Sequence, residues 1–198
     1  MEIDRALENL GDMFRDRGEY TGEMDEHGIA VPRPRYFTDR ITINTDRTLV
    51  IFALTKDLLS KLISEWKDLT SVDHFLHRYH TRHFVVVIGD GMASTTLKLL
   101  VERDQMLQAE GGMCQIWSLP ELQFNPARHM YVPRHEKMSD EEVAGLMAEY
   151  NLKSRTQLPL ILRTDKMARW LGLRHGDVVR ITRHNSTSGK YFYYRCCM

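Results

Sequence analysis

Residues 84–119 read FVVVIGDGMASTTLKLLVERDQMLQAEGGMCQIWSL, and this stretch sets the architecture of the first half of the chain. It begins with a continuous apolar run, residues 84–88, which glycines follow, as is typical of a strand buried on both faces. A helix is expected from about Ser94 until two glycines at 111–112 break it. Apolar residues then return at 113–119 as a second strand. The order of strand, helix and strand predicts a right-handed βαβ unit.

The residues before this stretch predict further elements of the same small α/β domain. Apolar residues recur at helical spacing over 3–14, and Gly18 ends that helix. Residues 19–35 contain several glycines and prolines and indicate a loop. Two β-rich runs within 41–54 flank a polar turn and predict a hairpin, and residues 56–69 carry one apolar stripe, which favours an amphipathic helix.

After Pro120 the pattern changes to short strands and single helices. Ser139 and Glu142 have the spacing of a capping box, so a helix is expected to follow Ser139. Residues 157–162 are expected to form a strand. Thr164 is the expected N-cap of a short helix that ends at Gly172. Strands over 177–183 and 190–196 close the chain, and the whole sequence therefore predicts an α+β protein of two domains.

The charges are divided unequally along a chain of 198 residues with zero net charge. Residues 1–120 contain 14 Lys and Arg against 19 Asp and Glu, whereas residues 121–198 contain 13 against 8. From residue 151 onward, the chain contains ten basic residues and only two carboxylates. This positive field could face nucleic acid, an acidic protein surface or water alone.

Bulk features favour a globular intracellular protein. The acidic, amphipathic N-terminus does not have the form of a secretion signal, and no apolar run reaches membrane-spanning length, so no membrane partner is expected. The three cysteines, Cys114, Cys196 and Cys197, do not have the spacing of a disulfide framework or a zinc site, which favours a reducing compartment.

Three local motifs resemble chemical sites, but none predicts a catalytic residue, a metal or a cofactor. Histidines recur every third residue over 74–83, but on a helix the first and last would point to opposite sides. The triplet 65–67, Glu-Trp-Lys, has a form found in restriction-type nucleases, but here it falls within a predicted helix. The glycine turn before Ser94 could present a helix N-terminus to phosphate, although a simple helix cap explains it equally well.

The C-terminal third resembles the small subunit shared by the eukaryotic nuclear RNA polymerases, together with its archaeal counterpart. The resemblance covers about residues 125–198 and rests on several spaced motifs in one order. These are His129-x-x-Val132-Pro133-x-His135-x-x-Met138-x-x-Glu141, Ala148-Glu149-Tyr150, Gln157-Leu158-Pro159, Met167 through Leu173 with Gly176, and Ser188-Gly189-Lys190-Tyr191 before Tyr194-Arg195.

The N-terminal half is more loosely similar to the jaw domain of the eukaryotic protein, which the archaeal counterpart lacks. Prolines and arginines over 32–35, the apolar strand at 84–88 and Gly91-Met92 before a helix recur in the family order. The chain departs from the family signature at Met130 and Tyr131. It also departs at Ser94, a position where the family usually has a proline. These departures suggest a divergent version, which a virus could encode.

The resemblance implies a jaw domain over residues 1–121 and a polymerase-assembly domain over 122–198. The assembly domain would dock on the largest subunit, beside other polymerase subunits, and the jaw would lie next to downstream duplex DNA. The residues expected near DNA are Gly91, Met92, Ser94, Thr95 and Lys98. Those expected at the partner interface are His129, Val132, Pro133, His135, Arg163, Arg169, Arg174, Arg180, Tyr191 and Arg195.

The sequence therefore predicts a non-catalytic subunit of a DNA-dependent RNA polymerase, without cofactors, whose phosphodiester chemistry belongs to the large subunits. Its expected location is the nucleus, or a cytoplasmic viral factory or virion if a virus encodes it. Two alternatives stay open. One is a nuclease-like DNA enzyme built on the N-terminal domain, and the other is a free DNA-binding regulator that uses the basic C-terminal end.

Overall fold

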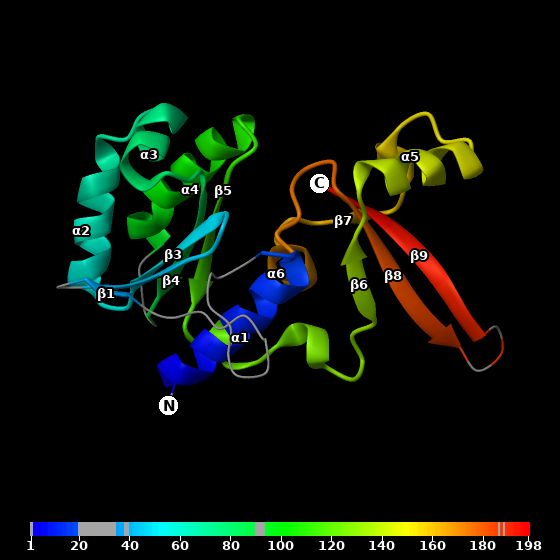
Figure 1. Cartoon of the computed structure of the whole chain (residues 1–198), viewed down its shortest axis with the longest axis horizontal. Helices are drawn as coiled ribbons and strands as arrows, with labels where there is room; N and C mark the ends of the chain where they lie inside the picture. Colours follow the sequence, from blue (N-terminus) through cyan, green and yellow to red (C-terminus); the bar gives the residue numbers. More distant parts are fainter. Residues whose placement is uncertain (1, 20–34, 38–39, 90–93, 186, 188) are drawn as a thin grey trace. The chain divides into compact units, whose positions relative to one another are not determined.

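The computed structural model describes residues 2–19, 35–37, 40–89, 94–185, 187 and 189–198, with the backbone alone for 35–37, 40–44 and 94–96. The chain forms two compact units, Met1–Phe124 and Asn125–Met198, and each contains one sheet (Figure 1). Helices and strands occur in both, which confirms the α+β class. Among the described residues, no helix is long and apolar enough to cross a membrane.

The N-terminal unit is built on a five-stranded sheet of order β1-β2-β3-β4-β5. Strands β1, β2 and β3 are antiparallel neighbours, whereas β3, β4 and β5 are parallel. The predicted hairpin (β2, β3) and the strand-helix-strand order (β4, α4, β5) are confirmed. The strands are β1 (Arg35–Phe37), β2 (Arg40–Asn44), β3 (Thr48–Ala53), β4 (His83–Ile88) and β5 (Met113–Ser118). The helices are α1 (Glu2–Arg17), α2 (Lys56–Lys67), α3 (Val72–Tyr79) and α4 (Ser94–Ala109).

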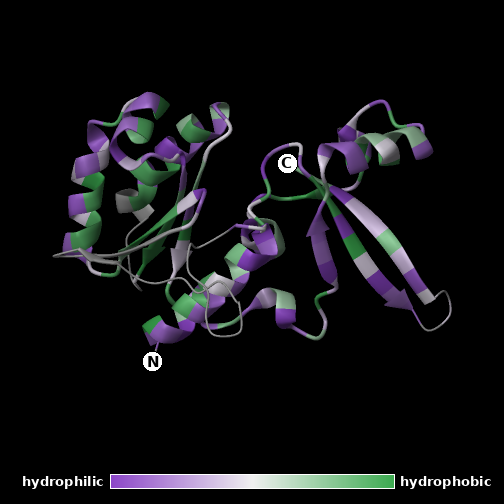
Figure 2. Ribbon diagram, in the orientation of Figure 1, coloured by the Kyte–Doolittle hydropathy of each residue, from purple (hydrophilic) through white to green (hydrophobic). Residues whose placement is uncertain are grey.

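One face of this sheet packs against α2, α3 and α4. Alternate strand residues such as Ile51 and Val86 join apolar side chains of the three helices in a buried cluster. Trp66 lies at its centre, fully buried, with edge-to-face ring contacts to Phe75 at 5.0 Å and Phe84 at 5.2 Å. Figure 2 shows hydrophobic residues concentrated on the strands that these helices cover.

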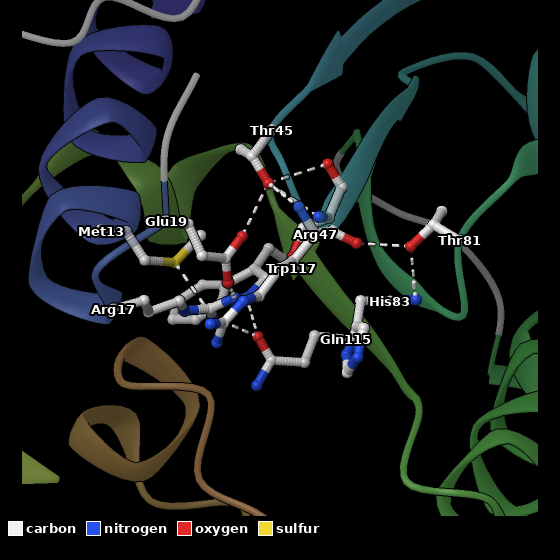
Figure 3. A network of polar contacts seen from close by, with 10 residues as sticks. Met13, Arg17, Glu19, Thr45, Arg47, Thr81, His83, Gln115 and Trp117 are labelled. Atoms are coloured by element: carbon white, nitrogen blue, oxygen red, sulfur yellow. Dashed lines mark hydrogen bonds and ion pairs between the residues drawn. The ribbon is translucent and has the colours of Figure 1, made fainter. Parts of the chain in front are cut away.

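The opposite face carries α1, and a polar network joins the two (Figure 3). The register places Gln115 of β5 beside Val85, on the face away from the Trp66 cluster. Arg17, at the C-terminal end of α1, donates from Nη2 to Oε1 of Gln115 at 2.6 Å. Burial lowers the pKa of Arg17 to about 10, although the carboxylate of Glu19 opposes this shift.

The division between the units falls after Phe124, three residues beyond the predicted boundary. Residues Pro120–Gln123 form a 3-10 turn, η1, that belongs to the N-terminal unit. The amide of Asn9 in α1 donates to the carbonyl of Leu122 at 2.7 Å, and Leu122 is fully buried.

The C-terminal unit has a four-stranded sheet of order β6-β8-β9-β7. Helix α5 packs Val143 and Leu146 against Val178 and Met138, and the predicted capping box at its N-terminus is confirmed. The strands are β6 (Arg134–Lys137), β7 (Leu160–Ile161), β8 (Val178–Asn185) and β9 (Gly189–Cys197). The helices are α5 (Asp140–Glu149) and α6 (Lys166–Trp170), with 3-10 turns η2 (Pro126–Arg128) and η3 (Arg155–Gln157).

Two local predictions in this unit were wrong in detail. The N-cap of α6 is Asp165 rather than Thr164, because its carboxylate accepts from the backbone N–H groups of Met167 and Ala168. The strand expected over 157–162 contains only the two residues of β7, because a second capping box holds residues 154–157 in a 3-10 turn.

The predicted left-handed end of α6 is confirmed at Gly172, whose φ is 63°. The N–H of Gly172 donates to the carbonyl of Arg169, and the N–H of Leu173 donates to that of Ala168. This pair of bonds is the Schellman arrangement, which satisfies carbonyls at the helix end.

The adjacent cysteines at the end of β9 are both fully buried. Neighbouring residues of a strand project to opposite faces, so Cys196 and Cys197 lie on different sides of the sheet. Burial raises the pKa of both thiols, to about 11 for Cys197. The three cysteines of the chain are free.

Candidate protein-docking surface

The hairpin of β8 and β9 places cations and aromatic rings side by side. Arg183 lies over the ring of Tyr193 at 4.8 Å, and Arg195 approaches the same ring at 5.5 Å. On the other face, Arg180 and Lys190 each lie 5.6 Å from the ring of Phe192. Such cation-π contacts hold the charged groups at the surface of the sheet.

Arg180 is fixed by carboxylates on two other elements. Its guanidinium lies 3.5 Å from Glu136 of β6 and 3.4 Å from Glu142 at the start of α5. Glu142 also caps α5, so the ion pair joins the cap to the sheet. Because the Nε of Arg180 is buried with no hydrogen-bond partner within the described part of the chain, this side chain is positioned at some cost in desolvation.

A tight turn before β6 presents two large apolar side chains to solvent. The N–H of Val132 donates to the carbonyl of His129 at 2.9 Å, and the N–H of Tyr131 donates to Nδ1 of His129 at 3.3 Å. The turn leaves Met130 83% and Tyr131 81% exposed. Apolar groups held outward in this way are available for contact with a partner.

This turn and the hairpin line an open groove of about 890 Å³. Its walls combine exposed apolar groups with cations, and Glu136 is the one carboxylate among the described residues that lines it. Such a composition suits a partner surface that offers both apolar and acidic groups. The lining residues are Met130, Tyr131, Val132, Pro133, Arg134, Glu136, Arg180, Thr182, Arg183, His184, Lys190, Tyr191 and Phe192.

His135 lies next to the groove and is half-buried. Its Nδ1 lies 2.6 Å from the carbonyl of Pro133, which can only accept, so Nδ1 carries the proton. Burial lowers the pKa of His135, against the opposing effects of that hydrogen bond and of Asp165. Neutral His135 therefore fixes the path of the chain into β6.

Four of the ten predicted interface residues line the groove, and six do not. Val132, Pro133, Arg180 and Tyr191 line the groove. Arg195 instead donates from Nη1 to the carbonyl of Leu160 in β7 at 2.9 Å. The other five, outside the groove lining, are His129, His135, Arg163, Arg169 and Arg174.

Sequence reasoning missed several groove residues, chiefly Arg183, Lys190 and Phe192. The available signal was the run of four aromatic residues at 191–194 with basic residues on both sides of it, at 180, 183, 190 and 195. It becomes informative only with the register, which pairs Thr182 with Phe192 and so assigns side chains to faces.

The residues predicted near DNA are described only in part. Gly91 and Met92 lie outside the described residues, and so do the side chains of Ser94 and Thr95. The backbone of α4 begins at Ser94, as expected, and Lys98 is exposed one turn into this helix.

The nuclease-type triplet, residues 65–67, forms hydrogen bonds with another helix of the same unit. Glu65 accepts a hydrogen bond from the hydroxyl of Tyr79 at 3.3 Å, and Trp66 donates to the same hydroxyl at 3.1 Å.

The histidines at 74 and 77 lie in α3, and His80 caps its end with a φ of 57°. Over the described ranges, no three His, Cys, Asp or Glu side chains are grouped as a metal site.

Comparisons with known proteins match both parts of the chain. Residues 124–197 match the family described as RNA polymerase Rpb5, C-terminal domain. The proteins named DNA-directed RNA polymerases I, II, and III subunit RPABC1 from Caenorhabditis briggsae and Caenorhabditis elegans are each 48% identical to this chain over 129 residues. These residues are 65% of this chain, and the match spans 58% of each relative's length.

Neither compact unit contains 129 residues, so this alignment includes residues of both. The predicted resemblance to the small subunit shared by the eukaryotic RNA polymerases is confirmed.

Proposed function

We propose that this chain, whose residues 124–197 match the Rpb5 C-terminal domain, is a non-catalytic subunit of a multisubunit DNA-dependent RNA polymerase. The observation that carries the proposal is the coincidence of that family match with the compact unit Asn125–Met198. Phosphodiester chemistry then belongs to the large subunits of the complex. The relatives are named as subunits of RNA polymerases I, II and III, which supports a nuclear location for a cellular version.

The C-terminal unit would dock on the largest subunit through the groove. Two observations support this role. The groove carries exposed apolar groups at Met130 and Tyr131, and it is rich in cations. Cations steer an acidic partner during encounter, and apolar groups at the centre of an interface supply most of the binding energy.

The N-terminal unit would lie beside downstream duplex DNA as a jaw. The start of α4 supports this part of the proposal, because a helix N-terminus presents free N–H groups and a partial positive charge that suit a phosphate. Lys98 adds an exposed cation on the same helix. Contacts of this kind reach the DNA backbone and do not depend on base sequence.

Purification of the tagged chain from its native source tests the proposal. We expect the two largest subunits of a polymerase to accompany it. The double variant Met130→Ser, Tyr131→Ser should recover about tenfold less of them, as for the loss of an apolar anchor, with an unchanged melting temperature because both side chains are exposed. Val101→Ser, at an exposed position of α4 in the other unit, is the matched control. Recovery of no polymerase subunit with the unaltered chain would refute the proposal.

A further inference from the structure

The outer edge of β9 is open along most of its length. On one side, β9 pairs with β8 from Gly189 to Cys196. On the other side, β7 pairs only with Cys196 and Cys197. The edge formed by residues 190–194, here named the β9 edge, has no strand beside it among the described residues.

The direction of the backbone groups along this edge follows from the bonds at its end. The N–H of Cys196 donates to the carbonyl of Pro159 at 2.8 Å, on the outer side, whereas the N–H of Cys197 donates to the carbonyl of Asp177, on the β8 side. In an antiparallel strand, alternate residues turn both backbone groups to the same side. Because the register with β8 is continuous, residues 190, 192 and 194 direct their N–H and C=O groups outward.

Those outward groups form a row that a further strand can bond. Within the described residues, the backbone N–H groups of Phe192 and Tyr194 have no protein acceptor. Exposed edges of this kind are commonly blocked by prolines, by lysines or by inward-pointing charges. Residues 191–194 contain none of these, and the one lysine, Lys190, stands at the end of the edge. It carries three consecutive aromatic residues, Phe192, Tyr193 and Tyr194, which favour strand pairing.

The charges at the two ends of the edge indicate what kind of strand would fit. Lys190 stands at one end of the edge and Arg195 follows its other end, and neither forms an ion pair with a carboxylate of the described residues. The nearby carboxylates of Glu136 and Glu142 are already engaged by Arg180. A strand with carboxylates near its ends and apolar side chains between them would therefore complement the edge.

We infer that the β9 edge binds an extended acidic segment of a partner subunit by strand addition. The inference rests on the proposed assembly role and specifies how the partner is held. A second copy of this chain is a poorer occupant, because pairing two β9 edges would bring Lys190 and Arg195 of both copies onto one small surface.

Amide hydrogen exchange on the native polymerase and on the free full-length chain tests this inference. In the free chain, the N–H groups of Phe192 and Tyr194 should exchange fast, and those of Tyr191 and Tyr193, which bond β8, should exchange slowly. In the assembled polymerase, exchange at Phe192 and Tyr194 should slow by about tenfold or more. Fast exchange at both residues in a polymerase that contains the chain would overturn strand addition and leave the proposed function intact.

A matched pair of variants separates backbone bonding from side-chain contact. Phe192→Pro and Phe192→Ala both remove the ring, but only proline removes the outward N–H, and neither removes a bond to β8. We expect the proline variant to be retained by the polymerase about tenfold more weakly than the alanine variant, as for the loss of one backbone hydrogen bond. Equal retention of the two, with equal melting temperatures, contradicts the inference.

The charge of the bound segment is tested by Lys190→Glu. Reversal should weaken retention several-fold at low salt, and the difference from the unaltered chain should shrink as salt rises. Tighter retention of Lys190→Glu would mean a basic segment and would overturn the inference. Concentration-dependent protection of Phe192 and Tyr194 in the free chain, with dimers on sedimentation, would overturn it too, because the edge would then belong to a second copy.

Discussion

Nη2 of Arg17 lies 2.6 Å from Oε1 of Gln115, and this hydrogen bond ties the last turn of α1 to the edge strand of the N-terminal sheet. The same oxygen accepts from the indole of Trp117 at 3.4 Å. The Arg17 side chain is only 3% exposed, so its charge depends on two neutral acceptors, Oε1 of Gln115 and the sulfur of Met13, and on Glu19 at 3.9 Å. Buried polar groups held in this way are costly to leave without a partner.

Arg17→Ala should therefore destabilise the chain by about 1.5–3 kcal/mol, the usual range for a hydrogen bond to a charged group. Urea unfolding followed by circular dichroism measures the change. Arg5→Ala is the matched control, because Arg5 on the same helix is exposed. The control should lose less than about 0.5 kcal/mol, as is usual for a surface substitution. Equal losses would show that the Arg17 network contributes no more than an exposed arginine does.

Gly172 should not tolerate a β-branched residue. Its φ of 63° costs an L-residue about 1–2 kcal/mol, and branching at Cβ adds strain. Gly172→Val should lower the melting temperature clearly, whereas Gly172→Asn should lower it less, since asparagine adopts this conformation more readily. Thermal unfolding of both variants beside the unaltered chain checks the order, and a reversed order would contradict the role given to this residue.

His135 should make the chain less stable in mild acid. Its pKa is lowered in the folded state, so the unfolded chain binds the proton first as the pH falls. The contribution of neutral His135 is fully present above the unfolded pKa of about 6.5 and is lost as the pH decreases below it. We expect His135→Asn to reduce the fall in melting temperature between about pH 7.5 and pH 5.5. An unchanged fall in melting temperature in His135→Asn would contradict the role given to this ring.

The segment Asn125–Met198 should fold without the rest of the chain. It contains its own sheet, a capped helix packed on that sheet and two capping boxes. Expressed alone, it should melt cooperatively and bind the largest subunit. An unfolded segment, or a folded one that does not bind, would argue against an independent assembly domain.

Replacing Ser94 and Thr95 by Asp should shorten the lifetime of elongation complexes on any template. Two carboxylates at the start of α4 would repel phosphate while favouring the helix itself, so subunit assembly should stay intact. Reconstituted polymerase with this double variant is compared with the unaltered enzyme as salt is raised. An unchanged lifetime at every salt concentration would remove phosphate contact from this turn.

Local sequence patterns were sufficient to predict most helices and strands. The buried strand at 84–88, the capping box at Ser139 and the helix stop at Gly172 each depend on residues close in sequence. The N-cap of α6 was predicted wrongly at Thr164, because the adjacent Asp165 is also a good cap and only the path of the chain decides which side chain meets the free N–H groups.

The polar contacts between distant segments could not be predicted in this way. Arg17 and Gln115 are 98 residues apart, and nothing near either residue indicates the other. The groove could not be predicted for the same reason, because Met130 and Phe192 come to one surface only through the pairing of β6, β8 and β9. The resemblance to a family supplied interface residues, but their grouping needed the strand register.

The rate at which the adjacent thiols of Cys196 and Cys197 react measures how often the C-terminal sheet opens. Their raised pKa values and full burial keep both protonated and shielded at neutral pH, so an alkylating reagent reaches them only during opening. Since the two sulfurs belong to opposite faces, the order in which they react reports which layer separates first. The chain thus carries its own probe of local unfolding, without any introduced label.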